Sequence, residues 1–385
     1  MAIWLEWILW VSVSMVVVVT VGYPAFLALT GPLVRRRRQV DDAEPRVSLI
    51  IAAHNEEACL RRRLENALSL DYPRERLEII VASDGSTDRT AAIAASFSDR
   101  GVVLRQFPRI GKTGVQNQAV RTAGGDILVF SDANASYRPD AVRKLVRNFA
   151  DPSVACVSGQ LVYTVADQSA GDCERSYWHY EKFMKLRESE LSSLIGANGS
   201  IYAVRKSDYV EIDTDLISDL VEPLALVKRG RRVVYEPEAV SVEEAAPAYS
   251  SEFRRKVRIL TRSIKGLVHM RALLNPFRYG VFSFQLLMHK VLRYFVPYFL
   301  ITAFSSLGAL AGLGIFQIPF AVAASAMAVA VAVGRVRAAR RTNPLVRSCH
   351  FLYYYLLVNY AMLPAWINVV RGTRITVWVP ERKQA

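Results

Sequence analysis

Polar side chains suited to binding a phosphate-bound cation and a nucleoside follow three separate apolar runs of the sequence. His54 and Asn55 follow the first run, Asp84 follows the second, and Asp132 follows the third. Mg²⁺ and Mn²⁺ take oxygen ligands, and substrate phosphates commonly complete their shell. Asp132 and Asn134 would supply a carboxylate and an amide oxygen to such a cation, and Asp84 would bind a nucleoside hydroxyl or base. The alternative for both aspartates is a turn role, which Asp often has after a strand.

The three apolar runs have the composition of strands that are buried on both faces of a sheet. They cover residues 47–53, 77–82 and 126–130. Helical spacing of apolar residues over 56–70 separates the first two runs, which predicts βαβ units and a largely parallel sheet. Ligands of such sheets bind outside the carboxyl ends of the strands. The polar residues that follow the runs are therefore expected to meet in one crevice.

Several other kinds of site are excluded by their missing motifs. The chain has no GxGxxG after the first strand and no GxxxxGK[ST], and the step Gly111-Lys112-Thr113 is too short for a P-loop. Its four cysteines show no CxxC spacing, and none of its five histidines lies in HExxH. A dinucleotide site, a disulfide scaffold and a thiolate zinc site are therefore not expected.

The net charge of +14 on this 385-residue chain is concentrated beside apolar segments. The run 8–29 is long enough to cross a bilayer, and Arg35 to Arg38 follow it. Only Glu6 is charged ahead of that run, so an uncleaved anchor is favoured over a signal peptide, which has a cationic start. This pattern predicts an inner-membrane protein whose residues from 35 onward lie in the cytoplasm. A nucleic-acid partner is not expected, because the membrane accounts for the basic residues.

Three further apolar segments, 294–314, 317–334 and 351–370, are candidate membrane spans. Three passes after a cytoplasmic domain would place the tail outside, whereas its basic residues favour the inside. One of the segments would then be interfacial or re-entrant, and the sequence leaves open which one.

The expected organisation has five parts. They are an anchor at 1–34, a catalytic domain at 45–245, an amphipathic interfacial helix region at 250–280, a membrane region at 281–370 and a basic tail at 371–385.

Three motifs in the predicted domain resemble those of the membrane-anchored family 2 glycosyltransferases, which include the cellulose, hyaluronan and poly-N-acetylglucosamine synthases. They are Ala53-His54-Asn55-Glu56-Glu57, Ser83-Asp84-Gly85-Ser86-Thr87-Asp88 and Phe130-Ser131-Asp132-Ala133-Asn134. The resemblance covers roughly residues 47–300. It implies an α/β fold of the GT-A type, Rossmann-like with a largely parallel sheet, flanked by transmembrane helices. It also implies inverting transfer from a nucleotide sugar with Mg²⁺ or Mn²⁺.

The same resemblance assigns roles to single residues. Asp84 would hold the nucleoside, His54, Asn55 and Glu56 would line its pocket, Asp132 would meet the metal and the diphosphate, and Lys112 would approach the nucleotide.

Asp219, in Ile217-Ser218-Asp219-Leu220, matches the catalytic base of the family. An ionised carboxylate can accept the proton of an acceptor hydroxyl as that hydroxyl attacks the anomeric carbon. Glu222, three residues further on, is the rival candidate. The alternative for Ser218 and Asp219 is a capping role at the start of a helix.

The acceptor side departs from the family pattern. The family's Gln-x-x-Arg-Trp reads here Arg255-Lys256-Val257-Arg258-Ile259, which keeps arginines for the diphosphate but lacks the tryptophan platform. That loss favours a single transfer over processive polymerisation. Asn198, Gly199 and Trp178 are acceptor-side candidates, although aromatic residues at helical spacing are more typical of a core.

The expected function is transfer of a hexose from a nucleotide sugar, with UDP the favoured carrier, to a membrane-associated or lipid-linked acceptor or a growing polysaccharide. A sugar-nucleotide-forming nucleotidyltransferase and a non-enzymatic membrane transporter are the alternatives. A nucleotidyltransferase would need a glycine-rich phosphate loop after the first strand, which this chain lacks. A transporter is expected to have ionisable residues inside its spans, whereas residues 295–334 carry no charge. Whether two copies assemble is left open.

Overall fold

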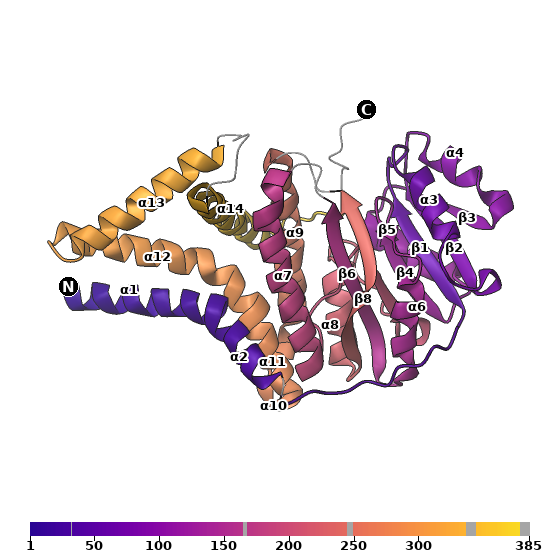
Figure 1. Ribbon diagram of the computed structural model, residues 1–385, viewed down its shortest axis with the longest axis horizontal. Helices are drawn as coiled ribbons and strands as arrows, with labels where there is room; N and C mark the ends of the chain where they lie inside the picture. Colours follow the sequence, from indigo (N-terminus) through magenta and orange to yellow (C-terminus); the bar gives the residue numbers. More distant parts are fainter. Residues whose placement is uncertain (32, 165–167, 245–248, 336–343, 378–385) are drawn as a thin grey trace.

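The predicted strands lie side by side in an eight-stranded sheet (Figure 1). The computed structural model describes residues 1–31, 33–164, 168–244, 249–335 and 344–377. The strand order is β3-β2-β1-β4-β7-β6-β8-β5. The strands are β1 (Val47–Ala53), β2 (Leu77–Asp84), β3 (Val102–Phe107), β4 (Ile127–Asp132), β5 (Ser136–Tyr137), β6 (Val154–Thr164), β7 (Tyr202–Arg205) and β8 (Arg232–Glu244).

The half of the sheet that carries the motifs is parallel, as predicted. β1 pairs in parallel with both β2 and β4, and β2 with β3. β7 runs antiparallel to β4 and β6, whereas β6 and β8 are parallel. Every residue of β1 is buried, which explains why its sequence is continuously apolar instead of alternating.

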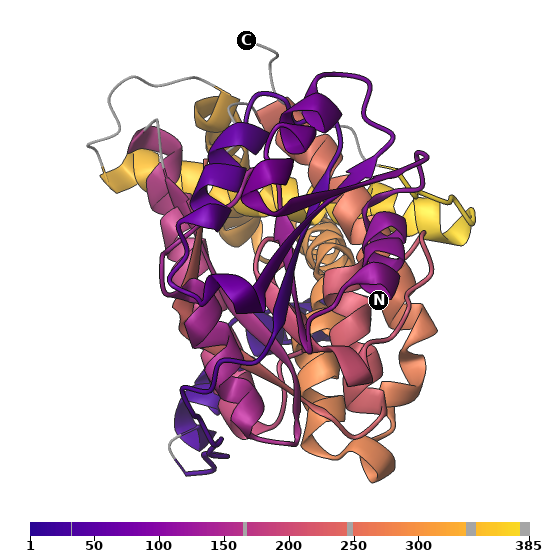
Figure 2. The same ribbon diagram turned by 90° about the vertical axis from the view of Figure 1, so that its right-hand side faces the viewer.

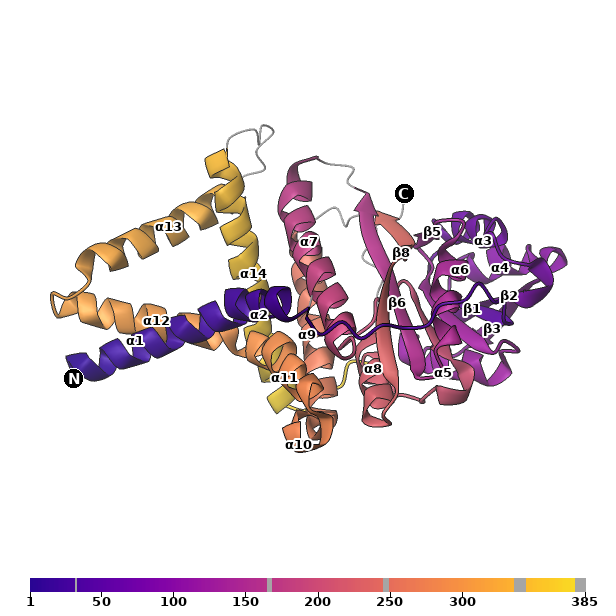
Figure 3. The same cartoon turned by 60° about the horizontal axis from the view of Figure 1, so that its bottom comes forward.

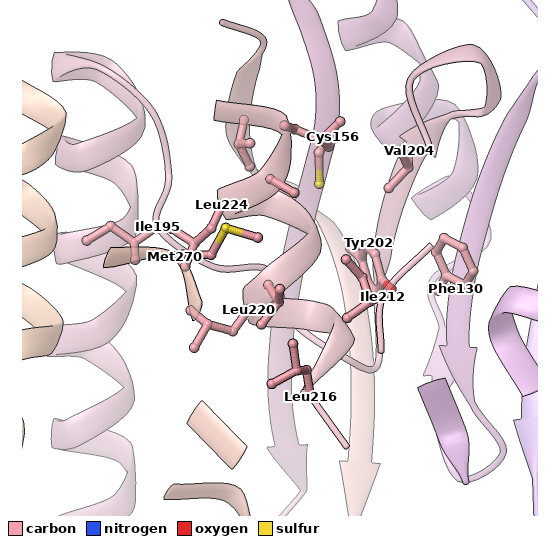
Figure 4. Packing of buried hydrophobic residues seen from close by; sticks show 14 of the residues in the cluster. Phe130, Cys156, Ile195, Tyr202, Val204, Ile212, Leu216, Leu220, Leu224 and Met270 are labelled. Carbon is pink, nitrogen blue, oxygen red and sulfur yellow. The ribbon is translucent and has the colours of Figure 1, made fainter. Parts of the chain in front are cut away.

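Helices cover both faces of the sheet and create two apolar cores. The helices of the domain are α3 (Leu60–Leu68), α4 (Thr90–Ala95), α5 (Lys112–Thr122), α6 (Ala141–Val146), α7 (Gln168–Leu191) and α8 (Ser218–Lys228), with short 3₁₀ turns η2 (Arg74–Arg76), η3 (Ser98–Arg100), η4 (Arg147–Ala150) and η5 (Lys206–Asp208). On one face, Leu220 and Leu224 of α8 pack over Tyr202 and Cys156 of the sheet (Figure 4). On the other face, residues of α3, α4 and α6 pack over β1 and β2.

The remaining helices lie on one side of the domain. They are α1 (Ala2–Val17), η1 (Val18–Gly22), α2 (Tyr23–Thr30), α9 (Tyr249–His269), η6 (Arg271–Leu274), α10 (Pro276–Tyr279), α11 (Val281–Leu286), η7 (Leu287–Val291), α12 (Leu292–Gly312), α13 (Gln317–Arg335) and α14 (Pro344–Val370). Among the described residues, Ala2–Thr30 and Val281–Gly312 are long and apolar enough to cross a membrane, and the apolar helix Gln317–Val333 is shorter. The predicted segment 351–370 is helical but is not among these candidates.

α14 differs in direction from the other C-terminal helices. α1 and α12 run side by side away from the sheet, and α13 returns from their far end (Figures 1 and 3). α14 instead lies crosswise behind the domain (Figure 2). It packs against α9, where the rings of Phe253 and Tyr360 stack with centroids 5.7 Å apart.

A buried polar cluster joins the first helical segment to the domain. Tyr23 donates a hydrogen bond of 2.7 Å to Oε1 of Glu188 on α7, and Nδ1 of His289 on η7 lies 2.7 Å from the same oxygen. Glu188 is fully buried. Three helices that are distant in sequence therefore meet on one carboxylate.

The basic run after the anchor also contacts the domain. Arg38 pairs with buried Glu236 at 3.0 Å, and Arg232 donates to the carbonyl of Arg36 at 2.7 Å. Part of this run therefore fixes the linker to the domain.

We expect Tyr23→Phe to destabilise the protein by about 1–3 kcal/mol, because the Glu188 carboxylate loses a hydrogen-bond donor while staying buried. Thermal unfolding in detergent measures this effect. Tyr360→Phe, at a tyrosine that is 64% exposed, is the matched control. Equal melting temperatures for the two variants would contradict the role given to the Tyr23 hydroxyl.

Candidate active site

The ends of the parallel strands lie at one edge of the sheet, as the sequence predicts. Ala52 of β1 is in register with Ala82 of β2 and with Asp132 of β4. His54, Asp84 and Asp132 consequently follow or end neighbouring strands at the same level.

Both carboxylate oxygens of Asp84, at this edge of the sheet, have hydrogen-bond or ion-pair partners. Its Oδ1 accepts hydrogen bonds from the backbone N–H groups of Ile110 (2.7 Å) and Gly111 (2.9 Å). Its Oδ2 pairs with Arg109 at 2.8 Å, and the side chain is fully buried. Asp84 thus fixes the loop that leads into α5, and its predicted contact with a nucleoside stays a prediction.

The turn after β1 is fastened to the turn after β2. Asn55, in a left-handed conformation with φ 50°, accepts a hydrogen bond of 2.8 Å from the backbone of Thr87. The backbone N–H of Glu56 donates to the Thr90 hydroxyl at 2.8 Å. His54 contacts the carbonyl of Asp84 at 2.7 Å through Nδ1. Burial lowers the pKa of His54, so its imidazole is neutral at pH 7.

Lys112 lies at the centre of the site. Its ammonium pairs with Oδ1 of Asp132 and donates to the carbonyl of Gly199 at 3.1 Å. A Cβ added at Gly199 would lie 2.5 Å from Oδ2 of Asp219 and 3.2 Å from Nζ of Lys112. The absence of a side chain at 199 therefore lets the loop approach both charged groups. The structure brings together Lys112, Asp132, Gly199 and Asp219.

The charges of this cluster shift one another's pKa values. Burial raises the pKa of Asp219 and the Asp132 carboxylate adds to the increase, while Lys112 and Arg262 oppose it. Burial alone would lower the pKa of Lys112, but the neighbouring Asp132 and Asp219 carboxylates produce a net increase. Lys112 therefore remains charged and balances two carboxylates in a site of low polarity.

Glu222, the rival base, lies in the core beneath α8. It is 1% exposed, and the Tyr202 hydroxyl donates to its Oε2 at 3.3 Å. Burial raises its pKa to about 8. The capping alternative for Ser218 is not supported, since α8 has no side-chain cap and Ser218 donates to Gln116 at 2.8 Å.

Asp132 and its neighbours can supply part of the coordination shell of a cation. The Asp132 side chain is 32% exposed. Asn134 donates through Nδ2 to Oε2 of Glu243 at 3.0 Å, and the other oxygen of Glu243 is buried without a hydrogen-bond partner. Within the described ranges, no three His, Cys, Asp or Glu side chains are grouped to hold a metal ion. This donor set fits a Mg²⁺ or Mn²⁺ ion that takes its other ligands from a diphosphate and water.

The acceptor-side candidates are placed less completely. Asn198 donates through its backbone N–H to the Ser158 hydroxyl at 3.0 Å, next to Gly199. Arg255 and Arg258 lie partly buried on α9. Trp178 belongs to α7, but its side chain is outside the described residues.

Four residues of the site were missed from the sequence. Arg262 of α9 donates to the Leu216 carbonyl and, at 3.1 Å, to the Thr113 hydroxyl, so it braces the loop before α8. Its spacing of four residues from Arg258 could have indicated it. Burial lowers the pKa of Lys185 on α7 to about 8, and its charge acts on Asp219. No sequence pattern indicated Arg109 or Glu243, because their partners are distant in sequence.

The described part of the C-terminal tail reaches the same loop. The carbonyl of Thr376 lies where a Cβ at Gly111 would be, and Gly111 has a φ of +87°. A side chain at position 111 is therefore disfavoured both by the backbone conformation and by the tail.

Residues 48–211 match the sequence profile described as glycosyl transferase family 2. The chain contains a family 2 glycosyltransferase domain. The three motifs on which the resemblance was based lie within the matched range, so that prediction is confirmed.

Curated relatives resemble parts of this chain. A beta-monoglucosyldiacylglycerol synthase of Synechocystis sp. is 37% identical over 114 residues, which cover 28% of this chain and 24% of the relative. A poly-beta-1,6-N-acetyl-D-glucosamine synthase of Staphylococcus aureus is 27% identical over 209 residues, or 52% of this chain and 50% of the relative. The chain therefore spans half or less of the length of these relatives.

A solved structure confirms the fold around the family 2 domain. A mannosyltransferase from Pyrobaculum calidifontis, in complex with GDP-Man and Mn²⁺, superimposes with a TM-score of 0.72 at 20% identity. The match covers 95% of this chain and all of that chain. The expected GT-A fold is thus confirmed.

The pKa of Glu222 predicts a pH dependence of stability. A carboxyl that keeps its proton to about pH 8 when folded, but only to about pH 4.3 when unfolded, stabilises the fold most fully at low pH. Between these values the free energy of unfolding falls by up to about 1.4 kcal/mol per pH unit from this group. Melting temperatures from pH 5 to 8 should decline less in Glu222→Gln than in Glu75→Gln, an exposed control. Identical pH profiles would contradict the buried, protonated state.

Proposed function

We propose that this chain is an inverting glycosyltransferase that moves a hexose from a nucleotide sugar to a membrane-associated acceptor. The observation that carries the proposal is the cluster of Lys112, Asp132 and Asp219 around Gly199, at the edge where the family motifs meet. The cluster provides one carboxylate for a cation and a second, separate carboxylate for a proton.

Asp219 is the general base in this proposal. The acceptor hydroxyl would give its proton to the Asp219 carboxylate while its oxygen attacks the anomeric carbon, and the bond to the nucleoside diphosphate would break on the opposite side. Burial that raises the pKa of Asp219 also makes its carboxylate a stronger base than an exposed one. Lys112 pairs with Asp132, acts electrostatically on Asp219, and would face the negative charge of the leaving diphosphate.

A divalent cation, held by Asp132 with Asn134 and Glu243 nearby, would neutralise the diphosphate as it leaves. Arg255 and Arg258 on α9 are the proposed further cations for that group. His54, Asn55 and Glu56 would border the nucleoside next to Asp84. UDP is the favoured nucleoside diphosphate, and a GDP sugar is the competing donor.

We further propose that the acceptor is lipid-linked or lies in the membrane, and that α1, α12 and α13 cross an inner membrane. The N-terminus lies at the far end of these helices, away from the domain (Figure 1). Three crossings return the chain to the domain side, where α14 lies crosswise and Thr376 contacts the loop at Gly111. The basic tail then lies with the domain in the cytoplasm, in accordance with the distribution of Arg and Lys. The Synechocystis relative, named for a glucosyl lipid, supports this acceptor class.

Asp219→Asn should reduce release of nucleoside diphosphate by about 10²–10⁴-fold, because the amide cannot take the acceptor proton. Detergent-purified protein, a sugar nucleotide and a lipid extract form the assay. Asp99→Asn, at an exposed aspartate on η3 between α4 and β3, is the matched control. A folded Asp219→Asn protein that retains near-wild-type transfer would refute the base assignment.

Removal of divalent cations by a chelator should abolish release from the preferred member of a panel of UDP and GDP sugars. Mn²⁺ or Mg²⁺ should restore it, since the diphosphate needs a counter-charge that Lys112 alone does not supply. Asp132→Asn should raise the cation concentration for half-maximal rate by at least about tenfold. Full activity in the chelator would contradict the assignment of a metal to Asp132.

A further inference from the structure

Arg63 is a fully buried cation that the site described above does not use. It lies on α3 and is 2% exposed. Its Nε and Nη2 donate to the Ser131 hydroxyl at 3.3 and 3.1 Å, and its Nη1 donates to Oδ1 of Asn66 at 2.9 Å. The guanidinium carbon lies 4.3 Å from the centre of the Tyr137 ring.

The partners of Arg63 are neutral throughout the part of the chain that the structure describes. Arginine is rarely buried to this extent without a carboxylate partner, because a desolvated charge is unfavourable. A purely apolar residue would fill the same space without that cost. The position therefore calls for a property that only the guanidinium supplies.

That property is the ability to donate hydrogen bonds in two directions, toward both ends of the turn 131–137. Ser131 precedes Asp132 directly, and its hydroxyl also donates to the Asp132 carbonyl at 3.0 Å. Asn66, oriented by Arg63, accepts from the backbone of Tyr137 at 2.8 Å and donates to the Tyr137 carbonyl at 2.9 Å. Arg63 thus fastens residue 131 directly and residue 137 through Asn66.

The turn held in this way carries two residues of the site, one charged and one neutral. Asp132 and Asn134 lie between the two fastened ends. The Tyr137 hydroxyl donates to the carbonyl of Ser200 at 2.9 Å, next to Gly199. Tyr137 also lies within electrostatic range of Arg63, Asp132 and Glu243. A displacement of Arg63 would therefore be transmitted to the carboxylate that meets Lys112.

We propose that Arg63 is a positioning residue: its planar guanidinium holds the turn 131–137 from the core side and thereby fixes Asp132 and Asn134 for the cation that carries the donor diphosphate. This inference rests on the proposed function for the identity of the ligand, but not for the geometry. Lysine cannot replace arginine here, because a single ammonium has no fork to reach Ser131 and Asn66 together.

The test compares Arg63→Lys, Arg63→Met and Ser131→Ala with the wild type and with Arg121→Gln. Arg121 is an exposed arginine whose partner is Glu211, so it serves as the matched control. Ser131→Ala removes the acceptor of two Arg63 donors together with the Ser131 hydrogen bond to the Asp132 carbonyl, and it leaves Arg63 itself in place. It keeps the test valid should an Arg63 variant fail to fold. Mn²⁺ binding in the presence of UDP is followed by electron paramagnetic resonance of the free ion, with melting temperatures recorded on the same samples.

We expect the Arg63 variants to raise the Mn²⁺ concentration for half-saturation by about tenfold or more, and Ser131→Ala to raise it by about threefold, with no change in the control. Arg63→Lys should not recover the wild-type value. Variants that melt at lower temperature but bind Mn²⁺ like the wild type would show that Arg63 serves only the core and would overturn the inference.

The Mn²⁺-binding measurement tests this inference separately from the proposed transferase function. If the wild type binds Mn²⁺ with UDP yet releases no nucleoside diphosphate from any donor, the transferase proposal fails while the comparison of variants still stands. A wild type that binds no Mn²⁺ in the presence of UDP would overturn the inference together with the metal assignment.

Discussion

The Lys112 ammonium, which pairs with Asp132 and acts electrostatically on Asp219, makes the interaction on which the site depends. Asp132 and Asp219 come from different elements and lie in an environment that raises the pKa of Asp219. Two such carboxylates repel each other strongly unless a cation lies between them. Lys112 supplies that cation and also contacts Gly199. In the proposed mechanism, the cation of the donor complex would join this arrangement at Asp132, which would keep the proposed base, Asp219, separate from the diphosphate.

The position of Lys112 depends on buried hydrogen bonds made by neighbouring residues. Asp84 accepts the backbone N–H groups of Ile110 and Gly111, and α5 begins at the next residue. From the opposite side, Arg262 braces the loop that leads into α8 and Asp219. Because Asp84 is buried with both carboxylate oxygens bonded, and Arg262 is buried with its Nη2 bonded to the loop, the charged side chains can be held in place before any ligand arrives.

The membrane-directed helices and the catalytic domain are joined through polar contacts as well as apolar ones. Glu188 receives Tyr23 from the first helical segment and His289 from the second candidate span. α7, which carries Glu188, also carries Lys185, whose charge acts on Asp219. The helix that anchors the domain thus runs from the junction with the apolar helices to the proposed base, which suits an acceptor that approaches from the lipid.

The sequence by itself determined the parallel half of the sheet and the convergence of His54, Asp84 and Asp132 on one edge. Both follow from local properties: strands buried on two faces are continuously apolar, and parallel strands end on the same side. Only the tertiary structure decided that Glu222 points into the core, that α14 lies crosswise, and that Arg63, Lys185 and Glu243 surround the site. Those outcomes depend on contacts between residues far apart in the chain. Burial and electrostatic coupling arise only when such residues meet, so no local pattern encodes them.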